Sequence, residues 1–138
     1  ITRLINMGVE PFLVASSLVM ACAQRLLKKI CTHCKTEDDI PKEALKTIRA
    51  KYPEAKGVKK FYKGAGCAQC NGTGYLGRLG TLETLLINDE LKDMINKRKP
   101  ETEIKEYLRS RSIPTLRDNA MRKFIKGWTT LEEVYRVT

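Results

Sequence analysis

Histidine is almost missing from this sequence, and the short motifs on which many enzymes depend are missing altogether. His33 is the single histidine in 138 residues. We find no G-x4-GK[ST] phosphate-binding loop, no HExxH metal-binding helix and no Ser-His-Asp set. We therefore expect no catalytic residue in this chain, and nothing in it that can perform chemistry alone.

Long apolar runs are also scarce. The longest extends from Pro11 to Ala23 and includes two serines, so it falls short of the ~20 apolar residues that a membrane-spanning helix needs. We interpret it as a buried core segment. No charged segment followed by a cleavage site opens the sequence, so we expect a reducing cytoplasm, where metal binding is favoured over disulfides. Because the sequence opens inside an apolar pattern and without methionine, we expect a fragment.

Aromatic residues make up only 7% of the sequence, whereas basic residues are abundant. Lys and Arg total 26 against 16 Asp and Glu, which gives a net charge of +10. Such a charge attracts nucleic acid, acidic lipid or an acidic protein surface. Nucleic-acid-binding modules interleave aromatic and basic side chains, but Phe61, Tyr62 and Tyr75 are few and scattered. We interpret most basic clusters as solvated surface and expect no nucleic acid partner.

Two cysteine pairs are the main chemical feature that the sequence does contain. Cys31 and Cys34 form one C-x2-C pair, Cys67 and Cys70 form another, and residues 35–66 separate them. Two such pairs can place four thiolates about 2.3 Å from one ion, at tetrahedral corners. Four sulfur ligands favour structural Zn(II) over an iron–sulfur cluster and leave no open position for catalysis. The alternatives are uncoordinated thiols or a redox pair, but redox chemistry needs one reactive pair and not two matched ones.

Glycines crowd the second cysteine pair, in the segment GAGCAQCNGTGYLGR (64–78). We expect them to let backbone amides turn toward the sulfurs. His33 lies inside the first pair and is expected to point to solvent, and Cys22 is interpreted as a small buried hydrophobe. We expect the ion to attach a helical insertion to the core. Metal removal should then disorder roughly Cys31–Gly77, while the helices from Asn88 onward keep much of their structure.

Periodicity and capping residues predict a mainly α fold with a small β component (α+β). The span Met20–Ile30 fits either a helix or a buried strand by periodicity alone. The other expected elements of the first half are a helix over Ile1–Met7 ended by Gly8, a helix from Pro11, and a surface helix with Leu45, Ile48 and Tyr52 on its apolar side.

Capping residues and glycines mark the element boundaries more clearly in the second half. We expect turns over Val58–Arg78 with at most a short strand at Phe61 and Tyr62, and then a strand over Leu79–Ile87 broken by Gly80. A helix capped by Asn88 follows, and then a helix with Ile104, Tyr107 and Leu108. Two last helices are expected to open with capping boxes at Thr115/Asp118 and Thr130/Glu133, and Gly127 is expected to close the first of them.

Four segments, taken in order, resemble one known family. They are TRLINMGVEPFLVASSL, AQRLLKKICTHCK, CNGTGYLGRLG and TLRDNAMRKFIKGWTTLEEVYRVT. Together they are similar to the C-terminal third of the type IV pilus-assembly (PilB-like) and type II secretion (GspE-like) ATPases. The resemblance covers nearly the whole chain and is weakest in the insertion from Lys35 to Lys60.

The resemblance implies a homo-hexameric cytoplasmic motor that uses ATP and Mg²⁺, bound through motifs upstream of Ile1. It implies that this motor is peripheral to the inner membrane through a platform protein of a pilus, secretion or competence system. It also implies that Met20–Ile30 is a strand. The expected parts are the end of a RecA-like ATPase core (1–30), a zinc-binding four-cysteine element with a helical insertion (31–78), and a strand plus C-terminal helical subdomain (79–138).

Two arginines match family positions in or near the motor core. For Arg25 and Arg78 the resemblance suggests two roles, one at a nucleotide or subunit interface and one as an ordinary helix-end or salt-bridge residue. We favour the ordinary role. The sequence departs from the family pattern at Thr32, where proline is usual, and at Leu82, where an aromatic residue is common. Neither departure removes a metal ligand.

Two other functional classes fit part of the pattern. A zinc-dependent nucleic-acid-binding module fits the charge and the cysteine pairs but not the aromatic content. A chaperone-type protein-binding module fits CAQCNGTG, which matches the C-x-x-C-x-G-x-G unit of zinc-rich co-chaperones. Those proteins repeat the unit four times, and CTHCKTED is not a repeat of it. We therefore favour a structural, zinc-stabilised part of a secretion motor.

Overall fold

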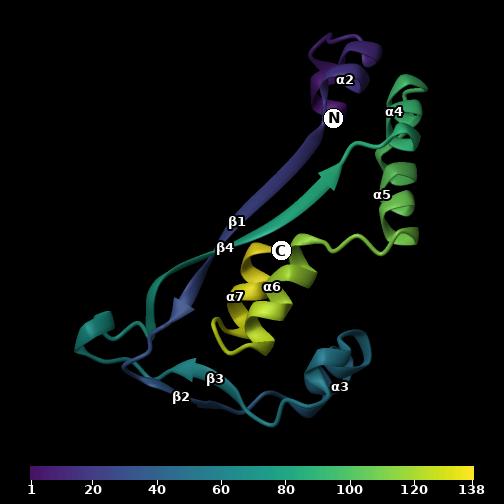
Figure 1. The fold of residues 1–138 in the computed structure, drawn as a ribbon. Helices are drawn as coiled ribbons and strands as arrows, with labels where there is room; N and C mark the ends of the chain where they lie inside the picture. The colour runs from purple at the N-terminus through teal and green to yellow at the C-terminus, as the bar shows by residue number, and fades with distance from the viewer. The chain divides into compact units, whose positions relative to one another are not determined.

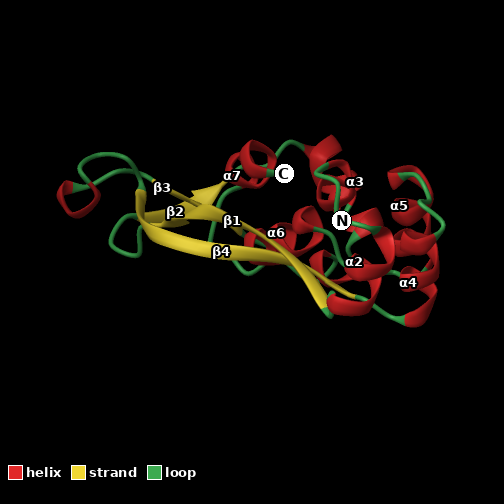
Figure 2. Ribbon diagram, turned by 90° about the horizontal axis from the view of Figure 1, so that it is seen from above, coloured by secondary structure: helices red, strands yellow, loops and turns green.

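The computed structural model describes all 138 residues and mixes helices with two small sheets (Figures 1 and 2). Strand β1 pairs with β4, and β2 pairs with β3. The α+β class is therefore confirmed. The elements are α1 (Thr2–Asn6), α2 (Pro11–Ser17), β1 (Met20–Ile30), β2 (Lys35–Asp38), α3 (Lys42–Lys51), the 3-10 turn η1 (Pro53–Ala55), β3 (Phe61–Gly64), the 3-10 turn η2 (Ala68–Cys70), β4 (Tyr75–Leu86), α4 (Asp89–Asn96), α5 (Glu101–Ser110), α6 (Leu116–Ile125) and α7 (Leu131–Val137).

The chain divides into two compact units, each made of two separate stretches of sequence. Unit 1 comprises Ile1–Ala23 and Leu82–Thr115, and unit 2 comprises Gln24–Thr81 and Leu116–Thr138. Each unit has its own cluster of buried apolar side chains. The three-part division expected from the sequence stays a prediction.

Unit 1 is held together by apolar side chains of α2, α4 and α5. Pro11 opens α2 as predicted, and the side chain of Asn88 accepts a hydrogen bond from the Leu91 amide at 3.0 Å, which confirms the predicted cap of α4. The cap satisfies one of the free amides at the start of the helix. The buried residues of this cluster are Val14, Ala15, Ile87, Leu91, Ile95 and Ile104.

The core of unit 2 joins the insertion to the two last helices. The rings of Phe61 in β3 and Phe124 in α6 stack with their centroids 4.9 Å apart, and the Tyr52 hydroxyl donates to Asp118 at 2.7 Å. The predicted surface helix, α3, is confirmed, but its apolar side packs into this shared core. We therefore revise the expectation that all helices after Asn88 are independent of the insertion. The cluster comprises Leu27, Ile48, Tyr52, Ala55, Phe61, Ala120, Met121, Phe124 and Val134.

Strand β2 escaped prediction because it has no hydrophobic pattern. Its sequence is KTED, and it pairs antiparallel with β3, with Lys35 opposite Gly64 and Asp38 opposite Phe61. Ion pairs join Glu37 to Lys60, the residue just before β3, and Asp38 to Lys63 within β3. This strand is stabilised by charge pairing and not by the apolar alternation that identifies a strand in sequence. The paired charges lie about 25 positions apart, so no local pattern reveals them.

Three expectations about apolar segments were wrong. Strand β4 begins at Tyr75 and is not broken at Gly80. Glycine suits this position because a Cβ added to Gly80 would lie only 3.0 Å from Gln24 Nε2. Cys22 is exposed on β1 and not buried. Within Pro11–Ala23, only Pro11, Val14 and Ala15 are buried, whereas Phe12 is 60% exposed.

No helix has both the length and the apolar character of a membrane span.

A four-cysteine candidate metal centre

The four predicted ligands lie together in unit 2. The Sγ atoms of Cys31, Cys34, Cys67 and Cys70 are all within 4.8 Å of one another. Three of the separations are 3.9 Å (Cys31–Cys67), 3.8 Å (Cys34–Cys70) and 3.7 Å (Cys67–Cys70). A tetrahedron of sulfurs bound at about 2.3 Å has edges of about 3.8 Å. These three separations match such edges, so the arrangement is compatible with a tetrahedral metal site.

Backbone amides turn toward two of the sulfurs, as the glycines around the second pair predicted. The Gly66 amide donates to Cys34 Sγ, and the amides of Cys67 and Gly74 donate to Cys70 Sγ, each at 3.2 Å. Amides that point at thiolates offset their negative charge. Gly66 and Gly74 have φ values of +91° and +75°, a region in which side chains are strained, so glycine is required to aim these groups.

Two glycine backbones also pack directly against each other beside the sulfurs. A Cβ added to Gly64 would lie 1.9 Å from the Gly74 carbonyl oxygen, and one added to Gly74 would lie 2.5 Å from the Gly64 carbonyl oxygen. The Gly74 carbonyl in turn accepts a hydrogen bond from the Cys31 amide at 2.9 Å. This close approach is what brings the first cysteine pair to the second.

The pKa values of the thiols diverge within the cluster. Burial, together with the neighbouring thiols, raises the pKa of Cys34 to about 12, although the Gly66 amide acts in the opposite direction. Burial also raises the pKa of Cys70, but the Cys67 and Gly74 amides and two neighbouring thiols outweigh it and lower that pKa to about 6. The amides that face Cys70 therefore favour its thiolate form, which is the form that binds a metal ion.

The ligand set is closed. Cys31 and Cys70 are buried, Cys34 and Cys67 are half-buried, and no histidine or carboxylate joins the cluster. His33 is exposed, as expected. Four thiolates complete a tetrahedral shell without an open position for substrate or water. The chemistry of this donor set is therefore that of a structural site.

Hydrogen bonds anchor the cysteine cluster to the last two helices. Just before Cys31, the Ile30 amide donates to the Trp128 carbonyl at 2.9 Å. Just after Cys34, the Lys35 ammonium donates to the Gly127 carbonyl at 2.8 Å and lies 4.2 Å from the centre of the Tyr62 ring. Both contacts reach the turn between α6 and α7, so the cysteine cluster and this turn form one assembly.

Sequence reasoning missed the main role of Glu133, a buried carboxylate at the start of α7. The Thr130 hydroxyl accepts a hydrogen bond from the Glu133 amide at 3.3 Å, which is one half of the predicted capping box. The other half is wrong, because the carboxylate accepts the Lys28 amide at 2.8 Å and two hydrogen bonds from Arg136. The sequence does place an acidic residue three positions before Arg136, which is a common ion-pair spacing on a helix. It does not reveal that this acidic residue is buried.

Arg25 and Arg78 are both exposed and lie on β1 and β4. Arg25 donates to the Gln24 carbonyl at 3.0 Å, and neither arginine forms an ion pair with an acidic side chain. The structure does not bring them to the cysteine cluster. Their role at a nucleotide or subunit interface stays a prediction.

Comparison with known proteins identifies the family. The model of the family described as "Type II/IV secretion system protein" matches residues 1–136. The chain belongs to this family. It is 43% identical over 134 residues to the type IV pilus assembly ATPase PilB of Thermus thermophilus, a match that covers 97% of this chain and 15% of the relative.

Two further relatives match over 138 residues, which is 100% of this chain. The type II secretion system ATPase E of Vibrio cholerae is 40% identical, and the type II secretion system protein HxcR of Pseudomonas aeruginosa is 37% identical. The match covers 27% of the first and 25% of the second, so the chain spans about a quarter or less of the length of the relatives it matches. The resemblance to pilus-assembly and type II secretion ATPases is thus confirmed.

Proposed function

We propose that this chain is the C-terminal, zinc-stabilised part of an ATPase that powers a type II secretion or type IV pilus-assembly system. The family supports the general role, since relatives named as pilus assembly and secretion ATPases align along the chain. ATP and Mg²⁺ would be bound by residues of the parent protein outside these 138. The parent is proposed to be a cytoplasmic homo-hexamer with a RecA-like core, peripheral to the inner membrane through a platform protein.

The observation that carries the zinc assignment is the geometry of the four sulfurs. The sulfurs of Cys31, Cys34, Cys67 and Cys70 lie within 4.8 Å of one another, three of their separations match the edges of a tetrahedral shell, and amides of the glycine-rich loop face two of the four sulfurs. Zinc supplies no reaction in such a site; it crosslinks the two cysteine pairs. The chain's own residues offset charge and close the shell, so folding of unit 2 and metal binding are coupled.

Elemental analysis of the chain purified without added metal tests the assignment. We expect one zinc ion per chain, loss of that ion in Cys67→Ser, and no loss in Cys22→Ser, which removes a cysteine outside the cluster. A zinc content well below one ion per chain after gentle purification would contradict the assignment. Its role in the motor is tested separately in the full-length protein, where Cys67→Ser is expected to lower steady-state ATP hydrolysis.

A further inference from the structure

The outer side of α3 carries a groove that the cysteine site does not involve. Its volume is about 450 Å³, and no carboxylate lines it. Residues 42, 46 and 49 lie at i, i+4 and i+7 and so share one face of the helix. A lysine from the chain just after η1 completes the groove. The lining residues are Lys42, Leu45, Lys46, Arg49, Ala50 and Lys56.

The cations of this groove have no acidic partners, in contrast to several of their neighbours. Lys51, Lys60 and Lys63 form ion pairs with Asp118, Glu37 and Asp38. The three lysines of the groove form no ion pair or side-chain hydrogen bond, and the Arg49 guanidinium donates from Nη2 to the Val58 carbonyl at 3.1 Å while its buried Nε has no partner. The groove therefore concentrates positive charge that the chain itself leaves uncompensated.

Two features of the groove lysines are electrostatically unfavourable. Lys42 is the first residue of α3, where the helix dipole already presents positive charge. Lys42 and Lys46 are like charges at i and i+4, which repel on a helix surface. An anion in the groove would relieve both effects at once.

A phosphate group matches this groove better than a carboxylate or a protein surface does. It carries close to two negative charges and three terminal oxygens, so it can accept from several ammonium groups and from an arginine fork at once. Protein interfaces rely on large buried apolar anchors, but no large apolar side chain is exposed between Leu26 and Leu76. The two larger apolar residues of α3, Leu45 and Ile48, already pack against the core or belong to it.

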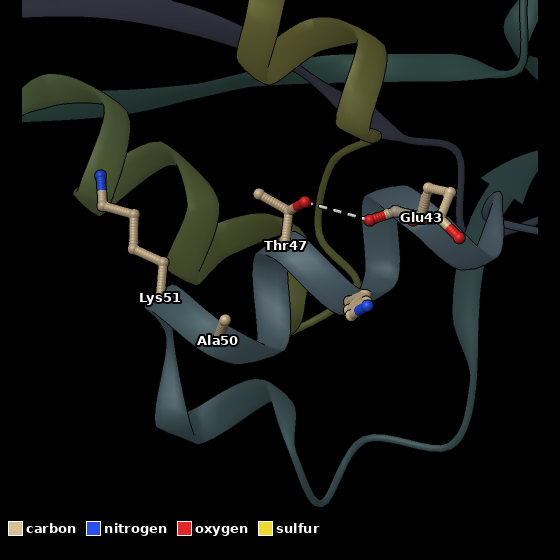
Figure 3. Close-up of a pocket in the computed structure, with 5 residues that line it drawn as sticks. Glu43, Thr47, Ala50 and Lys51 are labelled. Atoms are coloured by element: carbon tan, nitrogen blue, oxygen red, sulfur yellow. Dashed lines mark hydrogen bonds between the residues drawn. The ribbon is translucent and has the colours of Figure 1, made fainter.

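A second hollow on the same helix provides the contrast (Figure 3). Glu43, Thr47, Ala50 and Lys51 line it together with Lys46. Here the acidic Glu43 is present, and the Lys51 ammonium lies 3.0 Å from Asp118. Lys46 borders both hollows, but the second hollow also contains a carboxylate and a paired lysine, whereas the groove contains neither.

We propose that the groove formed by Lys42, Lys46, Arg49 and Lys56 binds a phosphate group. The ligand is either a soluble phosphorylated molecule or the headgroup of an anionic phospholipid, since both present the same chemistry. This site is separate from the cysteine cluster and does not depend on the role of the parent protein as a motor.

Two binding measurements distinguish the sources. Tripolyphosphate, titrated into the zinc-loaded chain and followed by amide chemical shifts, tests the soluble source, and sedimentation with phosphatidylglycerol or phosphatidylcholine vesicles tests the lipid source. We expect saturable binding in at least one arm, centred on residues 42–56. Lys42→Gln with Lys46→Gln should weaken it at least tenfold. The matched control Lys29→Gln with Lys92→Gln makes the same charge change outside the groove and should weaken it less than twofold.

Three outcomes would overturn the proposal. The first is no binding in either arm, and the second is equal weakening by the groove variant and the control, which would indicate attraction by net charge alone. The third is binding of an oligoglutamate or a DNA duplex at residues 42–56 more tightly than either phosphate probe, which would assign the groove to an acidic protein or to nucleic acid. Zinc content and thermal unfolding of each variant confirm that the fold is unchanged.

Discussion

At the scale of single residues, Gly64 sets the distance between the two cysteine pairs. Gly64→Ala would place a methyl group 1.9 Å from the Gly74 carbonyl oxygen, so the two backbones must separate. We expect destabilisation at the upper end of the ~1–3 kcal/mol that overpacking costs, together with weaker zinc retention under competition with a chelator. Gly57→Ala is the control, because nothing lies within 4 Å of its added Cβ. Equal stability of the two variants would show that the backbones yield easily.

Glu133 is a second residue with a specific prediction. Glu133→Gln should lower the free energy of unfolding by about 1–3 kcal/mol. Glutamine lacks the negative charge and has only one acceptor oxygen, so it cannot accept from Arg136 and from the Lys28 amide with both oxygens as the carboxylate does. Glu132→Gln, on the exposed side of the same turn, should change it by less than about 0.5 kcal/mol. Denaturant unfolding of both variants measures the difference.

The effect of Glu133 should also depend on pH. The hydrogen bonds from Arg136, followed by the Lys28 amide, lower the pKa of this carboxyl below its ordinary value of 4.5, although burial opposes them. A carboxyl with a lowered pKa in the folded state stabilises above its unfolded pKa, and this contribution is lost as pH falls through the folded pKa. The stability difference between wild type and Glu133→Gln should therefore be constant near neutral pH and shrink below about pH 4.5. A difference as large at pH 3 as at pH 7 would contradict this explanation.

At the scale of elements, the metal should support α6 and α7 as well as the insertion. Phe124 and Val134 share a buried core with Ile48 and Phe61, whereas α4 and α5 belong to the separate core of unit 1. We expect chelation to raise hydrogen exchange over Cys31–Gly77 and in α6 and α7, and to leave α4 and α5 protected. If α6 and α7 stayed protected while Cys31–Gly77 exchanged, their packing would not need the metal.

The same elements indicate what sequence can and cannot predict. Helices with local signals were found, because a cap such as Asn88 and its apolar residues lie within one or two turns. The cysteine ligands were found because the C-x2-C spacing is itself a local geometric constraint. Strand β2 and the carboxylate contacts of Glu133 depend on partners far along the chain, Lys60 and Lys28, and no local pattern encodes them.

Exposure was the other quantity that local pattern could not supply. Phe12 and Cys22 are apolar residues in apolar surroundings along the sequence, yet both are exposed. The spacing and type of apolar residues predict which side chains suit a core. Whether another element covers those side chains depends on the tertiary structure. Strand β1 could be distinguished from a helix only by its family resemblance.

At the scale of the whole molecule, the chain should not hydrolyse ATP alone. It contains no phosphate-binding loop, and the proposed phosphate groove of α3 offers no group positioned to activate water. Steady-state assays on the purified 138-residue chain should give turnover at background level with Mg²⁺ and ATP. Turnover that co-purifies with the chain and disappears in Lys42→Gln with Lys46→Gln would contradict this expectation.

The construction of unit 2 from two distant stretches also has a consequence for biosynthesis. All four cysteines have been made by residue 70, whereas the helices that cover Ile48 and Phe61 begin at Leu116, 46 residues later (116 − 70). At roughly 5–20 residues per second, a ribosome needs roughly 2–9 s to add that stretch. During this interval the nascent insertion has its own β2–β3 pairing but lacks the helices that cover its apolar side. The proposed zinc ion would join the two cysteine pairs at this stage, so we expect zinc supply to limit the yield of folded protein more during translation than after it.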